Sequence, residues 1–596
     1  MKKEYFVNEL KENDIKIKEK IKNSNLISVL RLLVFILLLV TFICAYKYNI
    51  VLLYILSLVL IVVFAFLIKK HSMIINKVKY YKSKDKVLKK YIARYDETWK
   101  SFEDTGEDFL NSNCIYSKDL DIFGKNSLYQ YINVASTKFG RNKLNKYLTE
   151  EKHNINEIKL RQQAVKEMTN NIGFCLEFQS YLNLFTENKE KNYDENLEKL
   201  LLLVENEPIK ITKFEKTISI ILPIFTITSI ILGILNLLPL YIISIFVIIQ
   251  LFFASIKYFK LRIILSPITS VREYIEKYNK LFHVLNKEKF LSEFLNKIKY
   301  ECKDALKAMK KLDTIISMAN IRDNALMYLI LNMLFMWDYQ CLNVFSKWSN
   351  LYKDKTRLWF ESIGKVEAIM SLSVISQVKE TTCMPNIDCK DKPIIQAVNI
   401  SHPLINEIKA VGNNVELKQG TYIITGSNMS GKTTFMRTIG INLVLAISGA
   451  QVCANSFTSS IFNIFTSMRL EDNIGEGIST FYAEINRIKE IIDSSTKPDN
   501  MIVLIDEIFK GTNYSDRIIC AKKIIERLNK SNIIDIVTTH DFDLCDLEND
   551  SNIKAKNYHF TEYYENENIK FDYKIKDGRC TTTNAQALMK LAGIIK

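Results

Sequence analysis

A run of 40 residues without a charged side chain, Thr217 to Ile256, limits what this chain can fold into more than any other feature. A helix crosses the apolar core of a bilayer with roughly 20 residues, so the run is about twice too long for one span. Asn236 and Pro239 interrupt it near the middle, where they predict a turn. We therefore predict a transmembrane helical hairpin over 216–257. A pair of helices buried in a large soluble core is the alternative.

A second apolar hairpin is predicted nearer the N-terminus, over 26–68. Its arms, 32–46 and 50–68, are almost purely apolar and are separated by KYN. A cleaved signal peptide is the weaker interpretation, because a second apolar span follows the first directly. Lys and Arg residues flank the outer ends of both hairpins. The positive-inside rule then predicts a multi-pass protein of the cell membrane, with the N-terminus, the middle segment and the C-terminal half in the cytoplasm.

The positive charge of the chain is unevenly placed. The formal net charge is +15. Between Lys69 and Lys100 there are 11 Lys/Arg and 3 Asp/Glu, a surplus of 8 beside an apolar block. A basic run in that position fits the anionic face of a membrane at least as well as it fits nucleic acid. The eleven cysteines are scattered without CxxC spacing, which favours free thiols over a zinc or redox site.

The rest of the chain divides into helical and mixed parts. Residues 271–312 carry apolar residues near heptad spacing and no Pro or Gly, which predicts long, exposed helical levers. The apolar run at 324–345 is too short to span and predicts a buried helix or a helix that contacts a partner. From about residue 390, short β-branched runs alternate with helices, which is typical of a parallel α/β sheet. The predicted segments are an N-terminal cytoplasmic segment (1–25), the first hairpin (26–68), a basic helical linker (69–116), the first part of a core and lever domain (117–215), the second hairpin (216–257), lever helices (258–389) and an α/β domain (390–596).

The stretch ITGSNMSGKTTF at 424–435 predicts a phosphate-binding loop. Its Gly and Lys-Thr spacing satisfies G-x-x-x-x-G-K-[ST] between a predicted strand at 422–425 and a predicted helix. Backbone N–H groups and the helix N-terminus would hold phosphate oxygens, with Lys432 on the β- and γ-phosphates and Thr433 on Mg²⁺. The expected nucleotide-binding residues are Gly426, Ser427, Asn428, Met429, Ser430, Gly431, Lys432, Thr433 and Thr434.

Two later strands end in residues that complete such a site. The predicted strand in NMIVLIDEIF ends in Asp506, a candidate Mg²⁺ partner, and Glu507, a candidate for the carboxylate that polarises the attacking water. The predicted strand in IIDIVTTHDF ends in Thr539 and His540, and His540 is placed where a side chain can sense the γ-phosphate. A solvated acidic turn and a structural histidine are the alternatives. Together these motifs predict Mg-dependent ATP hydrolysis, with Glu507 and His540 as catalytic residues and Thr433 and Asp506 on the metal.

In this order, TGSNMSGKTT, LIDEIFKGTNYSD and VTTH resemble the ATPase domain of the MutS family, the DNA mismatch-repair proteins of the ABC-type ATPases. The resemblance implies an α/β P-loop (ABC-type) ATPase domain after an all-α lever and core domain, here interrupted by transmembrane hairpins. It also implies that Ser479, in EGISTF, is the signature residue that caps the partner's nucleotide, so that two chains form a homodimer. HPLI at His402 and the segment 117–205 extend the likeness upstream.

The departures from the family bear on function. Apolar spans occupy the region where the family carries its mismatch-reading domain, and NYSD replaces the usual Ser-Thr-Tyr-Asp order. The expected function is a membrane-anchored MutS-like ATPase whose dimer closure moves the levers, with DNA as a candidate partner and mismatch reading disfavoured. The alternative is a membrane-associated switch that acts on a protein partner without DNA. An ABC-type transporter is least favoured, because the spans offer almost no polar residues to line a path.

Overall fold

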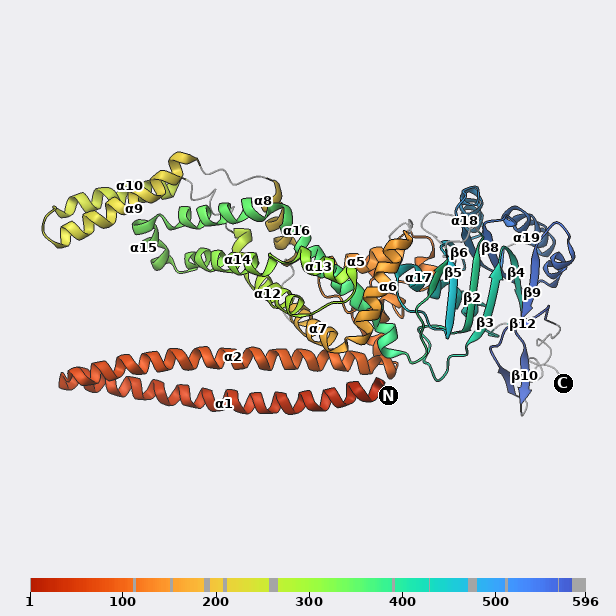
Figure 1. Ribbon diagram of the computed structural model, residues 1–596, viewed down its shortest axis with the longest axis horizontal. Helices are drawn as coiled ribbons and strands as arrows, with labels where there is room; N and C mark the ends of the chain where they lie inside the picture. The colour runs from red at the N-terminus through yellow and green to blue at the C-terminus, as the bar shows by residue number, and fades with distance from the viewer. Residues whose placement is uncertain are drawn as a thin grey trace.

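The computed structural model shows an elongated molecule with a helical region at one end and an α/β region at the other (Figure 1). Two apolar arms extend from the helical body in the same direction, away from the α/β region. The structure describes residues 2–110, 114–150, 154–186, 193–206, 212–256, 266–388, 392–427, 429–469, 480–509, 513–565 and 568–580.

The first arm is a hairpin of two very long helices, α1 (Lys2–Tyr48) and α2 (Val51–Tyr95). Asn49, with φ 54°, forms the turn between them, which is the place that KYN predicts. Both helices are long and apolar enough to cross a membrane, and their apolar parts are almost entirely exposed. Each helix continues without a break into a polar half, so the basic linker predicted after the hairpin is the second half of α2 up to Tyr95.

The second arm pairs α9 (Lys213–Ile234) with α10 (Leu240–Ile256). The predicted turn is confirmed, because Asn236 lies between them with φ 56°. Among the described residues, α9 is the third helix that is long and apolar enough to span, whereas α10 has 17 residues. Three long apolar helices could therefore cross a membrane, and four spans remain a prediction.

The helical body between the arms and the α/β region is built around α16 (Trp337–Val378), a helix of 42 residues. Its second half, from Trp359 onward, is buried almost continuously and packs against α5 and α6. The other helices of this body are α3 (Tyr116–Asp119), α4 (Leu128–Ile132), α5 (Lys138–Thr149), α6 (Ile155–Asn170), α7 (Ile172–Thr186), α8 (Tyr193–Asn206), α12 (Arg272–Lys287), α13 (Glu293–Glu301), α14 (Ala305–Ala319) and α15 (Ala325–Phe335). Short 3-10 helices are η1 (Thr98–Ser101), η2 (Glu107–Phe109) and η3 (Asn320–Asp323).

The expectation of a buried helix in the run 324–345 is wrong for its first part, α15. Four of its large apolar side chains, those of Leu326, Met327, Leu329 and Ile330, are 40–67% exposed. Composition alone could not reveal this, because an apolar run is compatible with either a protein interior or a lipid surface.

Glu367 fixes α16 to the start of α5. Its buried carboxylate accepts hydrogen bonds from the backbone N–H groups of Ser136 (2.9 Å) and Thr137 (3.1 Å) and from the Thr137 hydroxyl (2.7 Å). The helices approach closely here, because a Cβ added to Gly364 would come within 2.7 Å of the Phe139 backbone. Burial is the largest influence on Glu367 and raises its pKa to about 7, although the three hydrogen bonds act in the opposite direction.

We expect Glu367→Gln to flatten the dependence of stability on pH. A carboxyl group with a pKa of about 7 in the folded chain binds more protons than in the unfolded chain, so wild-type stability falls as pH rises from about 4.5 to 7. Wild type and variant should unfold alike at pH 4.5, and at pH 8 the variant should be more stable by roughly 2–3 kcal/mol. Urea unfolding in detergent at both pH values measures this, with the exposed Glu361→Gln on α16 as the control. Equal slopes for wild type and variant would contradict it.

The α/β region contains a six-stranded sheet in the order β12-β9-β4-β8-β7-β6, in which all neighbouring pairs are parallel except β12 with β9. Strands β4 and β8 are buried at every position, which is typical of a parallel sheet covered on both faces. The six strands are β4 (Gly420–Thr425), β6 (Asn463–Ser467), β7 (Met501–Asp506), β8 (Ile533–Thr538), β9 (Ala555–His559) and β12 (Lys576–Asp577). The helices of this region are α17 (Lys432–Ser448), α18 (Thr480–Ser494) and α19 (Tyr514–Leu528), with the 3-10 helix η5 (Phe542–Asn549).

A second, mostly antiparallel sheet was not expected from the sequence. It has the order β1-β5-β2-β3, formed by β1 (Asn386–Asp388), β2 (Ile394–Ile400), β3 (Asn413–Lys418) and β5 (Ser456–Ser460). Strands β10 (Glu562–Glu565) and β11 (Asn568–Phe571) form a separate hairpin. The parallel sheet predicted from about residue 390 is therefore confirmed, with an antiparallel addition.

Candidate active site

The predicted phosphate-binding loop lies between the end of β4 and the start of α17. Two positions of the loop require glycine, because their backbone φ angles are ones that other residues rarely adopt: Gly426 has φ +143° and Gly431 has φ +109°. A Cβ at Gly426 would also lie 2.7 Å from the Phe560 carbonyl oxygen. Met429, also with positive φ, is 86% exposed at the tip of the loop. Asn428 lies outside the described residues.

Lys432 extends back across this loop. Its Nζ donates to the carbonyl oxygens of Gly426 (2.7 Å) and Ser427 (3.0 Å) and lies 3.3 Å from His540 Nε2. The side chain is almost fully buried, so the ammonium group is directed at the loop rather than at solvent. Buried cations are stable where they are paired, and this one is held by loop oxygens at the place where phosphate oxygens would compete for it.

The two residues predicted to hold Mg²⁺ are brought together. Thr433 Oγ1 lies 3.1 Å from Asp506 Oδ1 and 3.0 Å from Oδ2, and the Thr538 hydroxyl also donates to Asp506. The three residues come from the start of α17 and the ends of β7 and β8, which meet because these parallel strands end at one edge of the sheet. Hydroxyl and carboxylate oxygens are the ligands that Mg²⁺ takes, so this donor set fits the metal.

Glu507 and His540 also meet at this edge. Glu507 Oε1 lies 3.1 Å from His540 Nε2, and Lys432 Nζ lies 3.3 Å from the same nitrogen. Glu507 follows β7 with φ 54°, and Phe509 after it has φ 56°. The Phe509 N–H donates to the buried Glu484 on α18 (2.7 Å), which fixes the turn. The turn keeps the Glu507 carboxylate at the edge where the predicted metal residues converge.

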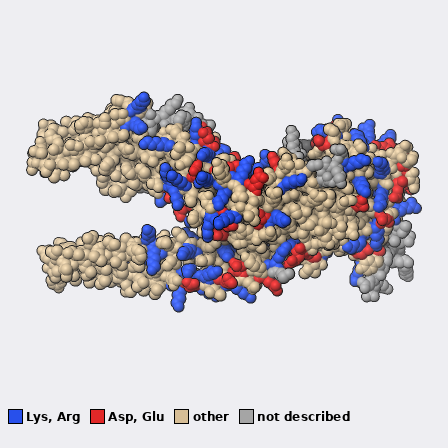
Figure 2. All heavy atoms as spheres, in the orientation of Figure 1, with Lys and Arg blue, Asp and Glu red and all other residues tan. Residues whose placement is uncertain are grey.

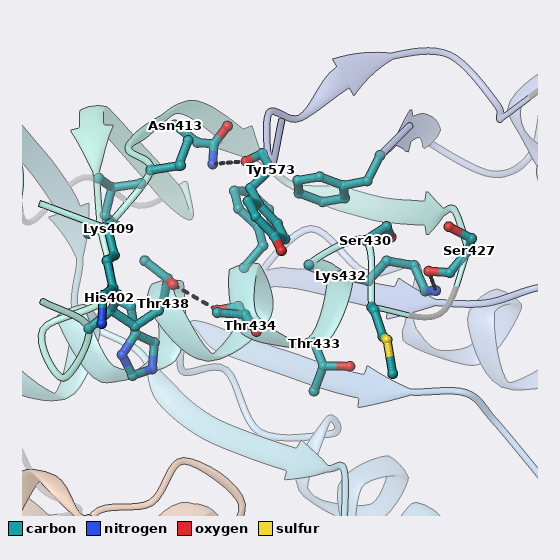
Figure 3. A pocket seen from close by; sticks show the side chains of 18 of the residues that line it. His402, Lys409, Asn413, Ser427, Ser430, Lys432, Thr433, Thr434, Thr438 and Tyr573 are labelled. Carbon is teal, nitrogen blue, oxygen red and sulfur yellow. Dashed lines mark hydrogen bonds between the residues drawn. The ribbon is translucent and has the colours of Figure 1, made fainter. Parts of the chain in front are cut away.

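A cavity of about 530 Å³ opens beside the loop (Figure 3). The loop and the start of α17 form one side, and the segment 402–411 with Asn413 forms the other. Apolar side chains, among them Val411, Phe560 and Tyr573, give it the mixed lining typical of small-molecule sites. Burial is the largest cause that lowers the pKa of His402 to about 4, and the positive charges of Arg437 and Lys379 add to it, so this ring is neutral near pH 7.

Sequence reasoning missed the residues that attach this site to the helical body. The buried Asp119 at the end of α3 accepts hydrogen bonds from the Thr466 hydroxyl (2.7 Å), two backbone N–H groups and Arg487 Nη1 (3.1 Å). Asp121 pairs with Arg437 of α17 (3.1 Å) and with Arg469 (2.6 Å). The helix that begins at Lys432 is therefore held directly by the helical body.

The remaining predicted site residues have the following places. Ser427 Oγ donates to Glu562 Oε2 (2.9 Å), Ser430 is buried under the loop, and Thr434 lines the cavity. Ser479 lies outside the described residues, directly before α18. The aromatic residues that line the cavity, Phe560 and Tyr573, follow no recognisable spacing in the sequence. His402 on the opposite wall belongs to HPLI, which the sequence marks only as part of the family resemblance.

Comparison with protein families matches residues 422–596 to "MutS domain V". Through this C-terminal region the chain is similar to the MutS family. The match begins inside β4, so the loop, Asp506, Glu507 and His540 all lie in the matched region, and both apolar arms lie outside it.

Curated relatives agree with this assignment. The DNA mismatch repair protein MutS of Persephonella marina is 32% identical over 241 residues, which covers 39% of this chain and 27% of the relative. That of Lactobacillus johnsonii is 32% identical over 243 residues, covering 39% and 28%. The probable DNA mismatch repair protein Msh6 of Drosophila melanogaster is 29% identical over 266 residues, covering 42% and 22%. The chain thus spans about a quarter of the length of these relatives.

Proposed function

We propose that the protein is a membrane-anchored ATPase of the MutS family, with an ABC-type P-loop site that hydrolyses ATP with Mg²⁺. The observation that carries the proposal is the convergence of Lys432, the Thr433–Asp506 pair and the Glu507–His540 pair at one edge of the sheet, beside the cavity. The match of residues 422–596 to MutS domain V and the similarity to mismatch-repair proteins support the same activity.

Each residue has a distinct task in this proposal. The loop N–H groups and Lys432 hold the phosphate chain, so that Lys432 exchanges the carbonyl oxygens of the loop for phosphate oxygens. Thr433 and Asp506 would hold Mg²⁺, which supplies charge neutralisation between the phosphates. Glu507 orients the attacking water and accepts its proton, because a carboxylate within hydrogen-bond distance of the nucleophile serves as a general base. His540 positions Glu507 and reaches the γ-phosphate. By resemblance, Ser479 would complete the site of a partner chain in a homodimer.

The apolar arms supply the proposed anchor. Figure 2 shows uncharged surface over the outer parts of both arms and Lys/Arg side chains gathered where the arms meet the body. This arrangement fits insertion of both arms into one membrane from the cytoplasmic side, with the lever and ATPase parts in the cytoplasm.

The segment 402–411 gives a route from the cavity to the anchor. It lines the cavity and also contacts the base of the first arm, because Asn406 Nδ2 donates to the Tyr95 carbonyl (3.4 Å) and Lys409 Nζ lies 3.2 Å from Glu97 Oε1. A nucleotide that shifts this wall would therefore shift the base of α2.

A second candidate function, a membrane switch that acts on a protein partner without DNA, is favoured by the placement of charge. Over 272–378 there are 17 Lys/Arg and 12 Asp/Glu, a surplus of 5 in 107 residues, against a surplus of 8 in the 32 residues 69–100. Several lever cations are paired, as Arg357 is with Glu198 and Glu205. The basic surplus thus lies mainly beside the membrane.

The ATPase rate of the detergent-solubilised protein, with and without homoduplex and mismatched DNA, tests these proposals. A salt-sensitive change of rate with DNA would support DNA as the partner. Hydrolysis that no DNA alters would support the protein-partner switch. Absence of any hydrolysis in the presence of Mg²⁺ would contradict the central proposal.

Lys432→Ala is expected to weaken ATP binding about tenfold to a hundredfold, because a hydrogen bond to a charged group contributes roughly 1.5–3 kcal/mol. Titration with a fluorescent ATP analogue measures the affinity. Lys418→Ala is the matched control, since that lysine is 65% exposed on β3 and pairs with Glu416. Equal affinity of Lys432→Ala and Lys418→Ala would exclude the loop as the phosphate site.

A further inference from the structure

The helix α15 has an inverted pattern of burial. Its large apolar side chains face outward: Leu326 is 67% exposed, Met327 44%, Leu329 47% and Ile330 40%. Its polar Asn332 is only 3% exposed and faces the protein. A surface helix of a soluble domain shows the opposite arrangement, with the apolar stripe inside.

Specific polar contacts hold α15 in this orientation. The Tyr328 hydroxyl donates to Asp338 Oδ2 (3.0 Å), Asn332 Nδ2 donates to the Tyr328 carbonyl (3.1 Å), and the Asp338 N–H donates to Asn332 Oδ1 (3.2 Å). Asp338 itself is 1% exposed at the start of α16. Rotating α15 to bury its apolar face would break the two contacts with Asp338, those of Tyr328 and Asn332, so the outward apolar face is a built feature of the fold.

This face is continuous with the second apolar arm. α15 packs against both α9 and α10, and in Figure 1 it lies beside them at the end of α14 and α16. At the base of the arm, the Tyr339 hydroxyl donates to the Phe253 carbonyl (3.3 Å) and Gln340 Nε2 donates to the Ser219 carbonyl (2.6 Å). Whatever covers the outer face of the arm therefore also meets α15.

The length of α15 excludes a complete crossing. Its 11 residues correspond to roughly 16 Å at 1.5 Å per residue, about half of the apolar core of a bilayer. The chain then turns by 80° into α16. Between Asn324 and Trp337 there is no charged residue, and Trp337 at the turn is of the type that settles at the membrane interface.

We propose that α15 is a membrane-embedded helix that does not cross, with its outward face against the acyl chains of the cytoplasmic leaflet. This rests on the proposed insertion of α9 and α10. The membrane-embedded part at the second arm then consists of three helices, α9, α10 and α15, rather than two. Because α15 leads directly into α16, the tip of the longest lever is fixed to the membrane.

Site-specific photocrosslinking tests this proposal in the full-length protein, reconstituted into phosphatidylcholine vesicles that carry an alkyne-tagged lipid. p-Benzoylphenylalanine replaces Leu326 on α15, Ile245 on α10 as the positive control, or Leu351 on α16 as the matched control. Leu351 is 64% exposed, close to the 67% of Leu326, and Ile245 is 51% exposed. ATP binding of each variant confirms that it is folded.

The expected result is a lipid adduct at 326 and at 245 and at least tenfold less at 351. An adduct at 245 without one at 326, or a crosslink from 326 to protein instead of lipid, would overturn the embedding of α15 and leave the anchor intact. Absence of lipid adducts at all three positions would overturn the proposed insertion of the arm and this inference with it.

Discussion

Replacing Glu507 with Gln is expected to stop ATP hydrolysis while ATP binding persists. Gln has the same shape and keeps a hydrogen-bonding oxygen near His540 Nε2, which lies 3.1 Å from Glu507 Oε1 in the wild type. It cannot accept the proton of the attacking water, and a positioned general base contributes about 10²–10⁴ in rate. We therefore expect kcat to fall by roughly 10²–10³. The residues proposed to hold the phosphates, Lys432 and the loop, are unchanged.

Steady-state phosphate release and fluorescent-nucleotide titration together measure this outcome. Glu526→Gln, on the exposed side of α19, is the control for loss of a negative charge in the same domain. A variant that keeps more than about a tenth of the wild-type rate would assign the base to another group, since loss of a base costs at least about a hundredfold. Loss of nucleotide binding instead of rate would place Glu507 in the binding site.

The parts of this site that could be predicted from the sequence are those encoded by local spacing. The loop, with Gly426, Gly431 and Lys432, is a contiguous motif, and Asp506 and His540 each follow a buried apolar run that predicts a strand end. Parallel strands bring their carboxyl ends to one edge of a sheet, so the order of the predicted strands and helices was enough to predict that these residues lie close together. Local spacing carries no information about the cavity wall, because Tyr573 and the segment 402–411 reach it from strands and loops distant in sequence.

The fold shows the same division. Hydropathy gave both hairpins and their turns, but it did not show that α1 and α2 run unbroken far beyond the apolar part. It also could not assign the side that α15 presents outward, since this depends on Asp338 and Asn332. Whether an apolar residue is buried depends on its packing partners as well as on the composition of the run in which it lies.

The proposed embedding of α15 bears on the proposed ATP-driven movement. In that arrangement α16 is held at the membrane by α15 and at its other end by Glu367 and the helical body, so its tip cannot swing freely. Movement between the ATPase region and the membrane would then be carried by the joint at Asp119 and Asp121 and by the contacts of the segment 402–411 with α2. The integrity of that joint is therefore the second major prediction.

Asp119→Ala is expected to destabilise the protein by about 3–5 kcal/mol, the cost of removing one partner from a buried ion pair. The Asp119 side chain is 1% exposed, and it accepts hydrogen bonds from the Thr466 hydroxyl, the Met468 and Arg469 N–H groups and Arg487. Its loss removes all of these hydrogen bonds from the joint. The midpoint of urea unfolding and the yield of nucleotide-binding protein measure the effect.

Asp121→Ala is the matched comparison, because Asp121 pairs with Arg437 and Arg469 nearby but its side chain is 27% exposed. Solvent screens this pair, so we expect a loss of roughly 1 kcal/mol or less. Asp119→Asn should fall between the two. An amide oxygen in the place of Oδ2 still accepts from Thr466, Met468 and Arg487, while the NH₂ group in the place of Oδ1 faces the Arg469 N–H. Equal losses of unfolding free energy for Asp119→Ala and Asp121→Ala would show that burial does not determine how much each carboxylate stabilises the joint. A large loss at Asp119 alone would show that this buried carboxylate contributes most of the stability of the contact between the helical body and the α/β region.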